Sequence, residues 1–333
     1  MFEFPVLIGD IGGTNARFGL IETKGAPPRL LSREATHGHP HPSAAIRASL
    51  TQSGAPAPRS AILAIAGRVD APAVQLTNAD WLVDAAAIGR DFGLARVALV
   101  NDYVPVAAGA AGIAPDELTP IGPELGNARG PRLVLGPGTG FGAAALIPYE
   151  DRLAIVSTEA GHTDLGPIDA EEAEIWPAVE RVEERVTVET LLSGPGLARL
   201  CAAIRAVRAG GDGSLCDPAE ITSTGLSGED PHAHAALALF AKLLGRVCGD
   251  LALTFLATGG VYIGGGIAPR IVPVLREGGF RAAFERKAPF AEQMRAIPTS
   301  VITVEDPAFS GLAALASESG RFVYHGQAWK PEG

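Results

Sequence analysis

Cysteine and basic residues are both scarce in this 333-residue sequence. The three cysteines, Cys201, Cys216 and Cys248, are too few and too scattered for a disulfide framework or a CxxC zinc site. Lysine and arginine together number 27 against 37 aspartates and glutamates, which gives a formal net charge of −10. A chain this acidic repels polyanions, so we expect no general binding to nucleic acid and none to an anionic membrane surface.

Long hydrophobic runs are absent too. The N-terminus, MFEFPVLIGD, has no basic region and carries an aspartate in its first apolar run, so we do not expect a signal peptide. The longest apolar stretch, residues 251–268, contains five glycines and suits a buried helix–turn–strand better than a membrane span. With 47% apolar and 19% charged residues, the composition is that of a globular protein, for which we expect a cytoplasmic location.

Two common nucleotide-binding motifs are missing. The only lysines are Lys24, Lys242, Lys287 and Lys330, and none belongs to a GxxxxGK[ST] loop. No GxGxxG sequence occurs, which argues against a dinucleotide-dependent oxidoreductase. Nucleotide phosphates, if bound, must therefore be held by backbone amides, hydroxyls and a divalent cation.

Apolar runs that alternate with turn signals indicate the fold class. They predict strands at residues 6–8, 17–21, 60–66 and 97–100, with helices at residues 43–52 and 84–92 between them. Further helices are expected at residues 170–184, 196–209, 232–257 and 307–320. This alternation is typical of an α/β fold with a mostly buried sheet.

The opening pattern of the chain occurs twice. VLIGDIGGTNARFGLI at residues 6–21 and RLVLGPGTGFGAAALI at residues 132–147 each contain an apolar strand, a turn of glycine and threonine, and a second apolar strand. We interpret this as an internal duplication that gives two related lobes, although two hairpins can also look alike by chance. Small residues and proline place the linker near residues 109–115.

Three glycine clusters are candidates for binding phosphate or nucleotide. The first, GDIGGTN, combines backbone amides and a threonine hydroxyl with Asp10, which would need a cation such as Mg²⁺ beside a phosphate. The second, GPGTGFG, is richer in glycine than a hairpin needs, whereas the first alone also fits an ordinary hairpin turn. The third, YIGGGIAP at residues 262–269, would admit a flat base or ribose, or else serve close strand–helix packing.

Polar residues that could act on a hydroxylated substrate form two further groups. Asn101 and Asp102 end an apolar strand, where Asp102 could accept a hydroxyl proton or simply cap the next helix. Glu159 and His162 lie in TEAGHTDLGP, and Glu189 lies in VTVETLLSGPG. Carboxylates and imidazole suit vicinal hydroxyls, which both donate and accept hydrogen bonds. A metal site at His162 is the weaker interpretation, because no second histidine is near it.

In their order and spacing, these motifs resemble the bacterial glucokinases of the hexokinase–actin–Hsp70 superfamily, and the resemblance covers essentially the whole chain. The EAGH and LLSGPG segments are the most specific to glucokinases, and the CxCGxxGC zinc motif of the ROK sugar kinases is absent. The resemblance implies a duplicated, ribonuclease H-like (actin-like ATPase) fold of two lobes. Each lobe is a mixed sheet flanked by helices, with the active-site cleft between them. The expected lobes are residues 1–112, completed by a C-terminal helix at 307–333, and residues 113–306.

The same resemblance assigns roles to individual residues. Asp10 would hold Mg²⁺ through water, and Asp102 would be the catalytic base. The residues expected to bind ATP and its phosphates are Gly9, Asp10, Ile11, Gly12, Gly13, Thr14, Asn15, Gly138, Thr139, Gly140, Gly264, Gly265 and Gly266. Those expected to bind glucose are Asn101, Asp102, Glu159, His162 and Glu189, with Thr77 and Asn78 nearby.

The implied activity is ATP- and Mg²⁺-dependent phosphorylation of glucose to glucose 6-phosphate at the entry to glycolysis, in a homodimer. Asp102 would remove the proton of the sugar 6-hydroxyl. The alternatives are a hexose kinase of broader specificity and, on the same scaffold, a non-catalytic sugar-sensing regulator. A regulator of that kind usually needs a DNA-binding segment, whereas this acidic chain starts directly with its first strand.

Overall fold

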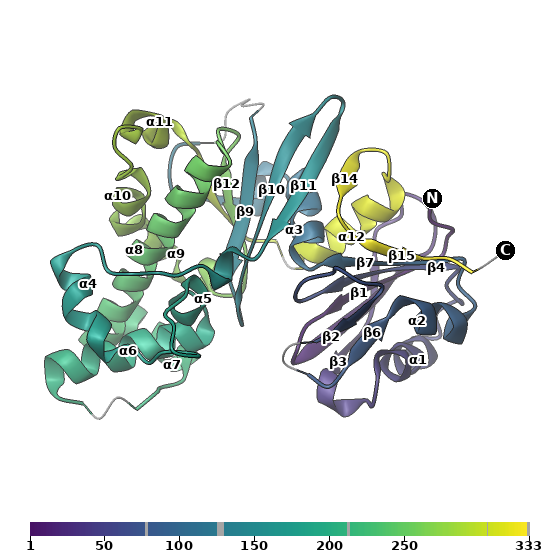
Figure 1. The fold of residues 1–333 in the computed structure, drawn as a ribbon, viewed down its shortest axis with the longest axis horizontal. Helices are drawn as coiled ribbons and strands as arrows, with labels where there is room; N and C mark the ends of the chain where they lie inside the picture. Colours follow the sequence, from purple (N-terminus) through teal and green to yellow (C-terminus); the bar gives the residue numbers. More distant parts are fainter. Residues whose placement is uncertain (77–78, 125–129, 212–213, 305, 332–333) are drawn as a thin grey trace. The chain divides into compact units, whose positions relative to one another are not determined.

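The computed structural model describes residues 1–76, 79–124, 130–211, 214–304 and 306–331 (Figure 1). The chain forms two compact units. Unit 1 consists of residues Met1–Ala114, Ala144–Ser157 and Val304–Gly333, and unit 2 of Pro115–Ala143 and Thr158–Thr303. Among the described residues, no helix is both long and apolar enough to cross a membrane.

Unit 1 is built on a six-stranded mixed sheet of order β15-β7-β4-β1-β2-β3. Its strands are β1 (Val6–Ile11), β2 (Asn15–Ile21), β3 (Arg29–Ala35), β4 (Ser60–Ile65), β7 (Arg96–Asn101) and β15 (Gln327–Trp329). β1 pairs antiparallel with β2 and parallel with β4, and β4 pairs parallel with β7. All residues of β4 are buried, as its unbroken apolar sequence predicts for a central strand.

Helices cover both faces of this sheet (Figure 1). α1 (Pro42–Ser53) and α2 (Ala85–Phe92) pack on one face, and α3 (Tyr103–Ala110) and α12 (Pro307–Ser317) on the other. α3 and α12 approach closely because glycine lies at their contact: a Cβ on Gly311 would lie 1.7 Å from the Pro105 carbonyl oxygen. The remaining elements before α3 are η1 (Thr36–Gly38), β5 (Ala73–Gln75) and β6 (Leu82–Asp84).

A second, seven-stranded sheet has the order β14-β11-β10-β9-β12-β13-β8. Its strands are β8 (Leu118–Pro120), β9 (Arg132–Pro137), β10 (Phe141–Tyr149), β11 (Arg152–Thr158), β12 (Val261–Ile263), β13 (Thr299–Ile302) and β14 (Phe322–Tyr324). The order β11-β10-β9-β12-β13 repeats β3-β2-β1-β4-β7 of the first sheet, with parallel pairs at the corresponding places. The two sheets therefore share one topology, as the predicted duplication requires.

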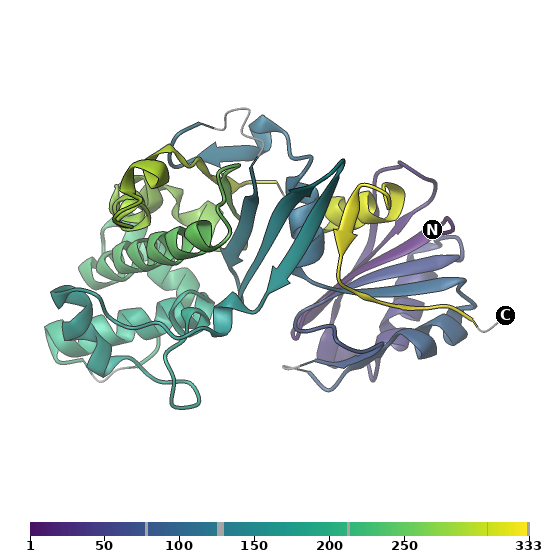
Figure 2. The ribbon, with the colours of Figure 1, turned by 45° about the horizontal axis from the view of Figure 1, so that its top comes forward.

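The helices of unit 2 surround α8 (Pro231–Thr254), which runs through the middle of this unit (Figure 2). α6 (Gly194–Ala209), α7 (Pro218–Ser227) and α10 (Gly279–Glu285) pack against it, and most of its apolar residues are fully buried. The shorter elements are η2 (Pro115–Glu117), η3 (Ala160–His162), α4 (Ala170–Ile175), η4 (Trp176–Ala178), α5 (Val188–Leu191), η5 (Ala268–Ile271), α9 (Val272–Arg276) and α11 (Ala291–Ala296).

Two predicted helices are wrong in extent. The acidic helix expected at residues 170–184 ends at Ile175, because Pro177 follows in η4 and both Glu183 and Glu184 have positive φ (48° and 64°). The closing helix ends at Ser317, and β14 and β15 follow it instead of a helix to residue 333.

The boundaries of the units also differ in detail from the expected lobes. Part of the expected linker, Gly109 and Ala110, belongs to α3, and the boundary falls between Ala114 and Pro115. Residues Ala144–Ser157 group with unit 1, whereas the sequence pattern places them in the larger lobe. These residues form most of the hairpin β10–β11. An alternating strand pattern predicts the strands themselves but not the unit with which they group.

Candidate active site

The first glycine turn, in unit 1, joins β1 to β2 and is held by its own backbone. The Gly12 amide donates to the Asn15 carbonyl oxygen at 3.0 Å. Thr36 fixes the turn from outside, because its amide donates to the Thr14 carbonyl at 2.9 Å and its hydroxyl to the Gly12 carbonyl at 3.1 Å. Among the described residues, the Gly13 and Thr14 amides make no hydrogen bond, so both remain available to an anion.

Asp10, the predicted metal residue, is part of a chain of alternating charges in unit 1. Its carboxylate pairs with Arg17, which lies opposite it in the β1–β2 register. Arg17 also pairs with Asp306, whose other oxygen accepts from Arg33 at 2.7 Å. The sequence does not reveal the role of Arg17 and Asp306, because 289 residues separate them.

The end of β7 places Asn101 and Asp102 at the start of α3. Asp102 occupies the N-cap position, yet its side chain makes no capping hydrogen bond. The cap is supplied by Asn101, whose Oδ1 accepts from the Tyr103 amide at 3.0 Å while its Nδ2 donates to the Gly67 carbonyl at 3.0 Å. The alternative role foreseen for Asp102, capping α3, therefore belongs to its neighbour.

The second glycine turn, in unit 2, follows the same plan as the first. The Gly138 amide donates to the Gly140 carbonyl at 2.7 Å, and the Gly138 carbonyl accepts from the Gly194 amide at 2.9 Å. No hydrogen bond from the Thr139 or Gly140 amide is found within the described part of the chain. Each turn thus uses its first amide internally and leaves the next two for a ligand.

Glu189 ties the second glycine turn to the LLSGPG segment. It lies in the first turn of α5, and its Oε2 accepts from the Phe141 amide at 2.7 Å. The two segments are so close that a Cβ on Gly140 would lie 2.4 Å from this same oxygen. The predicted sugar residue is therefore in contact with the predicted phosphate turn.

The EAGH turn packs against the same place. A Cβ on Gly161 would lie 2.4 Å from the Phe141 carbonyl oxygen, and the Thr158 hydroxyl donates to the Ala143 carbonyl at 3.1 Å. Glu159 and His162 are on the exposed side of this turn, with 3.9 Å between Glu159 Oε2 and His162 Nε2. These two side chains can thus meet a ligand from solvent, and they become an ion pair when the imidazole is protonated.

The third glycine run begins where β12 ends. Gly264 and Gly136 are nearly in backbone contact, because a Cβ on Gly136 would lie 2.1 Å from the Gly264 carbonyl oxygen. Gly265 has φ +81°, and a Cβ there would lie 2.2 Å from the Pro137 carbonyl oxygen. Only glycine therefore fits at this position without strain. Gly265 and Gly266 are exposed. Burial raises the pKa of the preceding Tyr262, which keeps its phenol neutral beside the run.

The predicted site residues thus form one group in each unit. Unit 1 holds residues 9–15 with Asn101 and Asp102, and unit 2 holds residues 138–140, Glu159, His162, Glu189 and residues 264–266. Thr77 and Asn78, which the resemblance places near the sugar, lie outside the described residues. Arg17 and Asp306 are the charged residues at the first group that sequence reasoning missed, although Arg17 is close enough to Asp10 in a hairpin to have been considered.

No cluster of three or more histidine, cysteine, aspartate or glutamate side chains that could hold a metal ion is found in the described ranges. A single carboxylate beside unbonded amides fits the way in which Mg²⁺ is often bound, through one carboxylate, waters and the phosphates of the substrate. Asp10 is paired with Arg17, so the Arg17 side chain would have to move away before Asp10 could serve as that carboxylate.

Two sheets of one strand topology, each with a turn of glycine and threonine between two neighbouring strands (β1–β2 and β9–β10), define the actin-like ATPase fold used by sugar kinases. A solved structure, a glucokinase from an Antarctic psychrotroph, matches with a TM-score of 0.80 and 31% identity over 94% of this chain and 99% of that one. The Glucokinase family model matches residues 7–319. The chain belongs to the glucokinase family.

Curated relatives agree over nearly their full length. A glucokinase of Brucella suis biovar 1 (strain 1330) is 42% identical over 99% of this chain and 96% of its own. A glucokinase of Agrobacterium fabrum (strain C58 / ATCC 33970) is 42% identical over 98% of this chain and 97% of its own.

Proposed function

We propose that this protein phosphorylates glucose with ATP to give glucose 6-phosphate. The observation that carries the proposal is the contact of Glu189 with the second glycine turn, since it brings a carboxylate suited to sugar hydroxyls against backbone amides suited to phosphate. Full-length similarity to glucokinases at 42% identity supports glucose as the sugar.

The two glycine turns are proposed to bind the ATP phosphates. Phosphoryl transfer spreads negative charge over the equatorial oxygens, and fixed amide donors stabilise that charge without reorganising. The Gly13, Thr14, Thr139 and Gly140 amides are directed by turns whose other hydrogen bonds are already made. Gly264, Gly265 and Gly266 are assigned to the adenosine, where absent side chains allow close approach.

The sugar is proposed to be recognised by Asn101, Glu159, His162 and Glu189, with Asp102 as general base. Asp102 removes the 6-hydroxyl proton as the oxygen attacks phosphorus. Mg²⁺, near Asp10, would supply positive charge to the phosphates. Asn101 acts in part by fixing the start of α3, because both ends of its amide already bond to the backbone.

We also propose Mg²⁺ as the working cation, a homodimer and a cytoplasmic location, all three on the family resemblance. The predicted lobes, residues 1–112 with 307–333 and residues 113–306, are proposed as the moving bodies of the enzyme.

The test is production of ADP by the purified protein with a panel of hexoses. We expect ADP only when sugar is present, with glucose giving the highest kcat/KM over mannose, fructose and glucosamine. A buried polar site can reject a sugar that lacks a matched hydroxyl by up to ~10⁴-fold. ADP formed at the same rate without sugar would contradict the proposal, and so would a product phosphorylated at a hydroxyl other than the 6-hydroxyl.

A further inference from the structure

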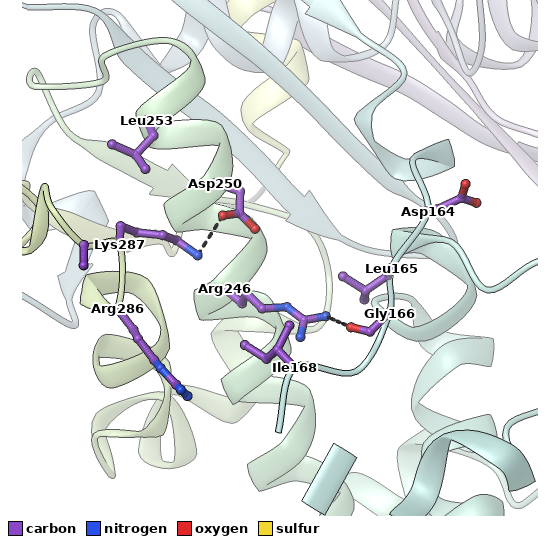
Figure 3. A pocket seen from close by; sticks show the side chains of 10 residues that line it. Asp164, Leu165, Gly166, Ile168, Arg246, Asp250, Leu253, Arg286 and Lys287 are labelled. Carbon is purple, nitrogen blue, oxygen red and sulfur yellow. Dashed lines mark hydrogen bonds and ion pairs between the residues drawn. The ribbon is translucent and has the colours of Figure 1, made fainter. Parts of the chain in front are cut away.

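Unit 2 contains a cavity of about 470 Å³ that none of the proposed active-site residues line (Figure 3). Its walls come from the segment 164–168, from α8 and from residues 286–288 after α10. In a chain with a net charge of −10, the cavity is unusual because three of its lining residues are cationic: Arg246, Arg286 and Lys287.

Arg246 and Lys287 are held in place by contacts that leave them little freedom. Arg246 is buried in α8, and it donates to Glu172 Oε2 at 2.6 Å and to the Gly166 carbonyl at 2.8 Å. The Lys287 side chain is only 9% exposed and lies 2.8 Å from Asp250 Oδ1. Figure 3 shows the interactions of Arg246 with Gly166 and of Lys287 with Asp250. Two ordered cations therefore stand at fixed points of the wall.

Arg286 is different, because in the part of the chain that the structure describes its guanidinium forms no ion pair with a carboxylate. The Arg286 charge acts on Asp169, whose pKa is lowered chiefly by a hydrogen bond from Lys242 and least by Arg286. Asp169 is thus already neutralised by another cation. Arg286 is exposed and available to an anion from solvent.

Of the two carboxylates that line the cavity, only Asp250 pairs with one of its cations. Asp164 is bound by Arg185, with Asp164 Oδ1 2.6 Å from Arg185 Nη2. The Asp250 side chain is 59% exposed, so it can turn to water and leave Lys287 to a stronger anion. A phosphate oxygen is such an anion, since charge-assisted hydrogen bonds to arginine and lysine are short and strong.

The rest of the wall is apolar. Leu165, Ile168, Leu253 and Ala288 line the cavity beside the cations. A bare inorganic ion would leave these side chains in water, whereas a phosphate carried on a small carbon body would cover them. Glu159 and His162 lie a few residues before the wall segment 164–168. An occupant of the cavity would therefore contact the chain just after the proposed sugar turn.

We propose that this cavity is a binding site for a small organic phosphate monoester, distinct from the ATP and sugar site. Arg286 and Lys287 bind the phosphate, Asp250 yields its place on Lys287, and the apolar wall contacts the carbon body. Arg246 holds the wall through Gly166 and Glu172 rather than acting as the main ligand.

The test is calorimetric titration of glycerol 3-phosphate into the protein with glucose and a non-hydrolysable ATP analogue present to occupy the other site. We expect saturable one-site binding, weaker for inorganic phosphate and absent for glycerol. Arg286→Gln should weaken binding about 10-fold or more, because one charge-assisted contact is lost. Asp250→Asn should strengthen it several-fold, because Lys287 loses its competitor.

Arg295→Gln is the matched control, since it removes the same charge from another exposed arginine of unit 2. Its affinity should equal that of the unchanged protein. The proposal is overturned if glycerol 3-phosphate does not bind, if Arg286→Gln and Arg295→Gln behave alike, or if Asp250→Asn weakens binding. The readout needs no turnover, so failure here is distinct from failure of the proposed kinase activity, which the hexose assay measures.

Discussion

Asn101 and Asp102 are adjacent at the junction of β7 and α3, but their side chains are used differently. Asn101 ends β7 and Asp102 follows it, and the sequence offers Asp102 as a possible cap of α3. An amide can donate and accept at once, which lets Asn101 bridge the Gly67 carbonyl and the Tyr103 amide, whereas a carboxylate can only accept. Asn101 supplies the cap, and Asp102 keeps the chemistry proposed for it.

Asp102→Asn is the direct test of the general base. We expect kcat to fall by ~10²–10⁴-fold, the usual effect of removing such a base, because the amide cannot accept the hydroxyl proton. The glucose dissociation constant should change little, since the amide keeps the shape and one acceptor. Rapid-quench measurement of the phosphoryl-transfer step, with sugar binding measured separately, checks both parts. Near-normal turnover in this variant would disprove the assignment.

Asp10 lies beside a cation of the protein itself, and this bears on the proposed binding of Mg²⁺. Arg17 competes for the Asp10 carboxylate, while Asp306 offers Arg17 another partner. We expect Asp306→Asn to weaken metal binding roughly 3- to 10-fold, because Arg17 then stays on Asp10. Electron paramagnetic resonance titration with Mn²⁺ and the ATP analogue measures this without turnover.

Arg33→Gln is the control for that experiment. Arg33 contacts Asp306 Oδ2, whereas Arg17 contacts Oδ1, and the Arg33 side chain is more than half exposed. It should change metal affinity far less than Asp306→Asn. Equal affinities in the unchanged protein and in Asp306→Asn would show that Arg17 does not compete with the metal.

At the scale of elements, the helices depend strongly on their first residues. α8 begins at Pro231 after Asp230, whose carboxylate accepts from the His232 and Ala233 amides at 2.8 and 3.1 Å. The hydrogen bond from Arg205 is the main cause that lowers the pKa of Asp230 below its usual value, and burial opposes it. One side chain thus caps the central helix of unit 2 and joins it to α6.

This arrangement predicts a pH-dependent stability. Because the folded pKa of Asp230 is depressed, its contribution is present above the unfolded pKa and is lost as pH falls through the folded pKa. Asp230→Ala should therefore cost about 1–3 kcal/mol of unfolding free energy at pH 7, and less at pH 3. Urea unfolding at both pH values measures the difference.

Asp217→Ala provides the comparison, since Asp217 caps α7 through one amide and is exposed. It should cost less than Asp230→Ala at pH 7. If the two substitutions cost the same, or if the effect of Asp230→Ala does not shrink in acid, the Arg205 contact does not add to the cap.

The regular elements were largely predictable, and the errors have physical causes. β4 and β7 were predicted from apolar runs, α8 from a long apolar sequence, and α6 as a helix that begins two residues later than it does. Glutamates favoured a helix through residue 184, but helix propensity is a weak prior and the chain turns at Glu183 and Glu184. β14 and β15 are three residues each, too short for alternation to be visible in the sequence.

At the scale of the whole molecule, the repeated strand order is the main feature of the fold. The two similar hairpins visible in the sequence, β1–β2 and β9–β10, occupy corresponding places in the two sheets, and each has its glycine turn between its two strands. The chain therefore has two similar glycine turns, one in each unit, whereas the residues proposed to bind the sugar differ between the units.

The sequence by itself determined the α/β class, the duplicated hairpins and the identity of the glycine turns, because these depend on local spacing and on residues that permit close backbone approach. Tertiary structure alone decided which partner each polar group meets. Arg17 reaches Asp306 across 289 residues, Glu189 reaches the Phe141 amide, and the cations around α8 line one cavity. Such contacts join segments far apart in the chain, and only packing of the folded elements brings them within hydrogen-bonding distance.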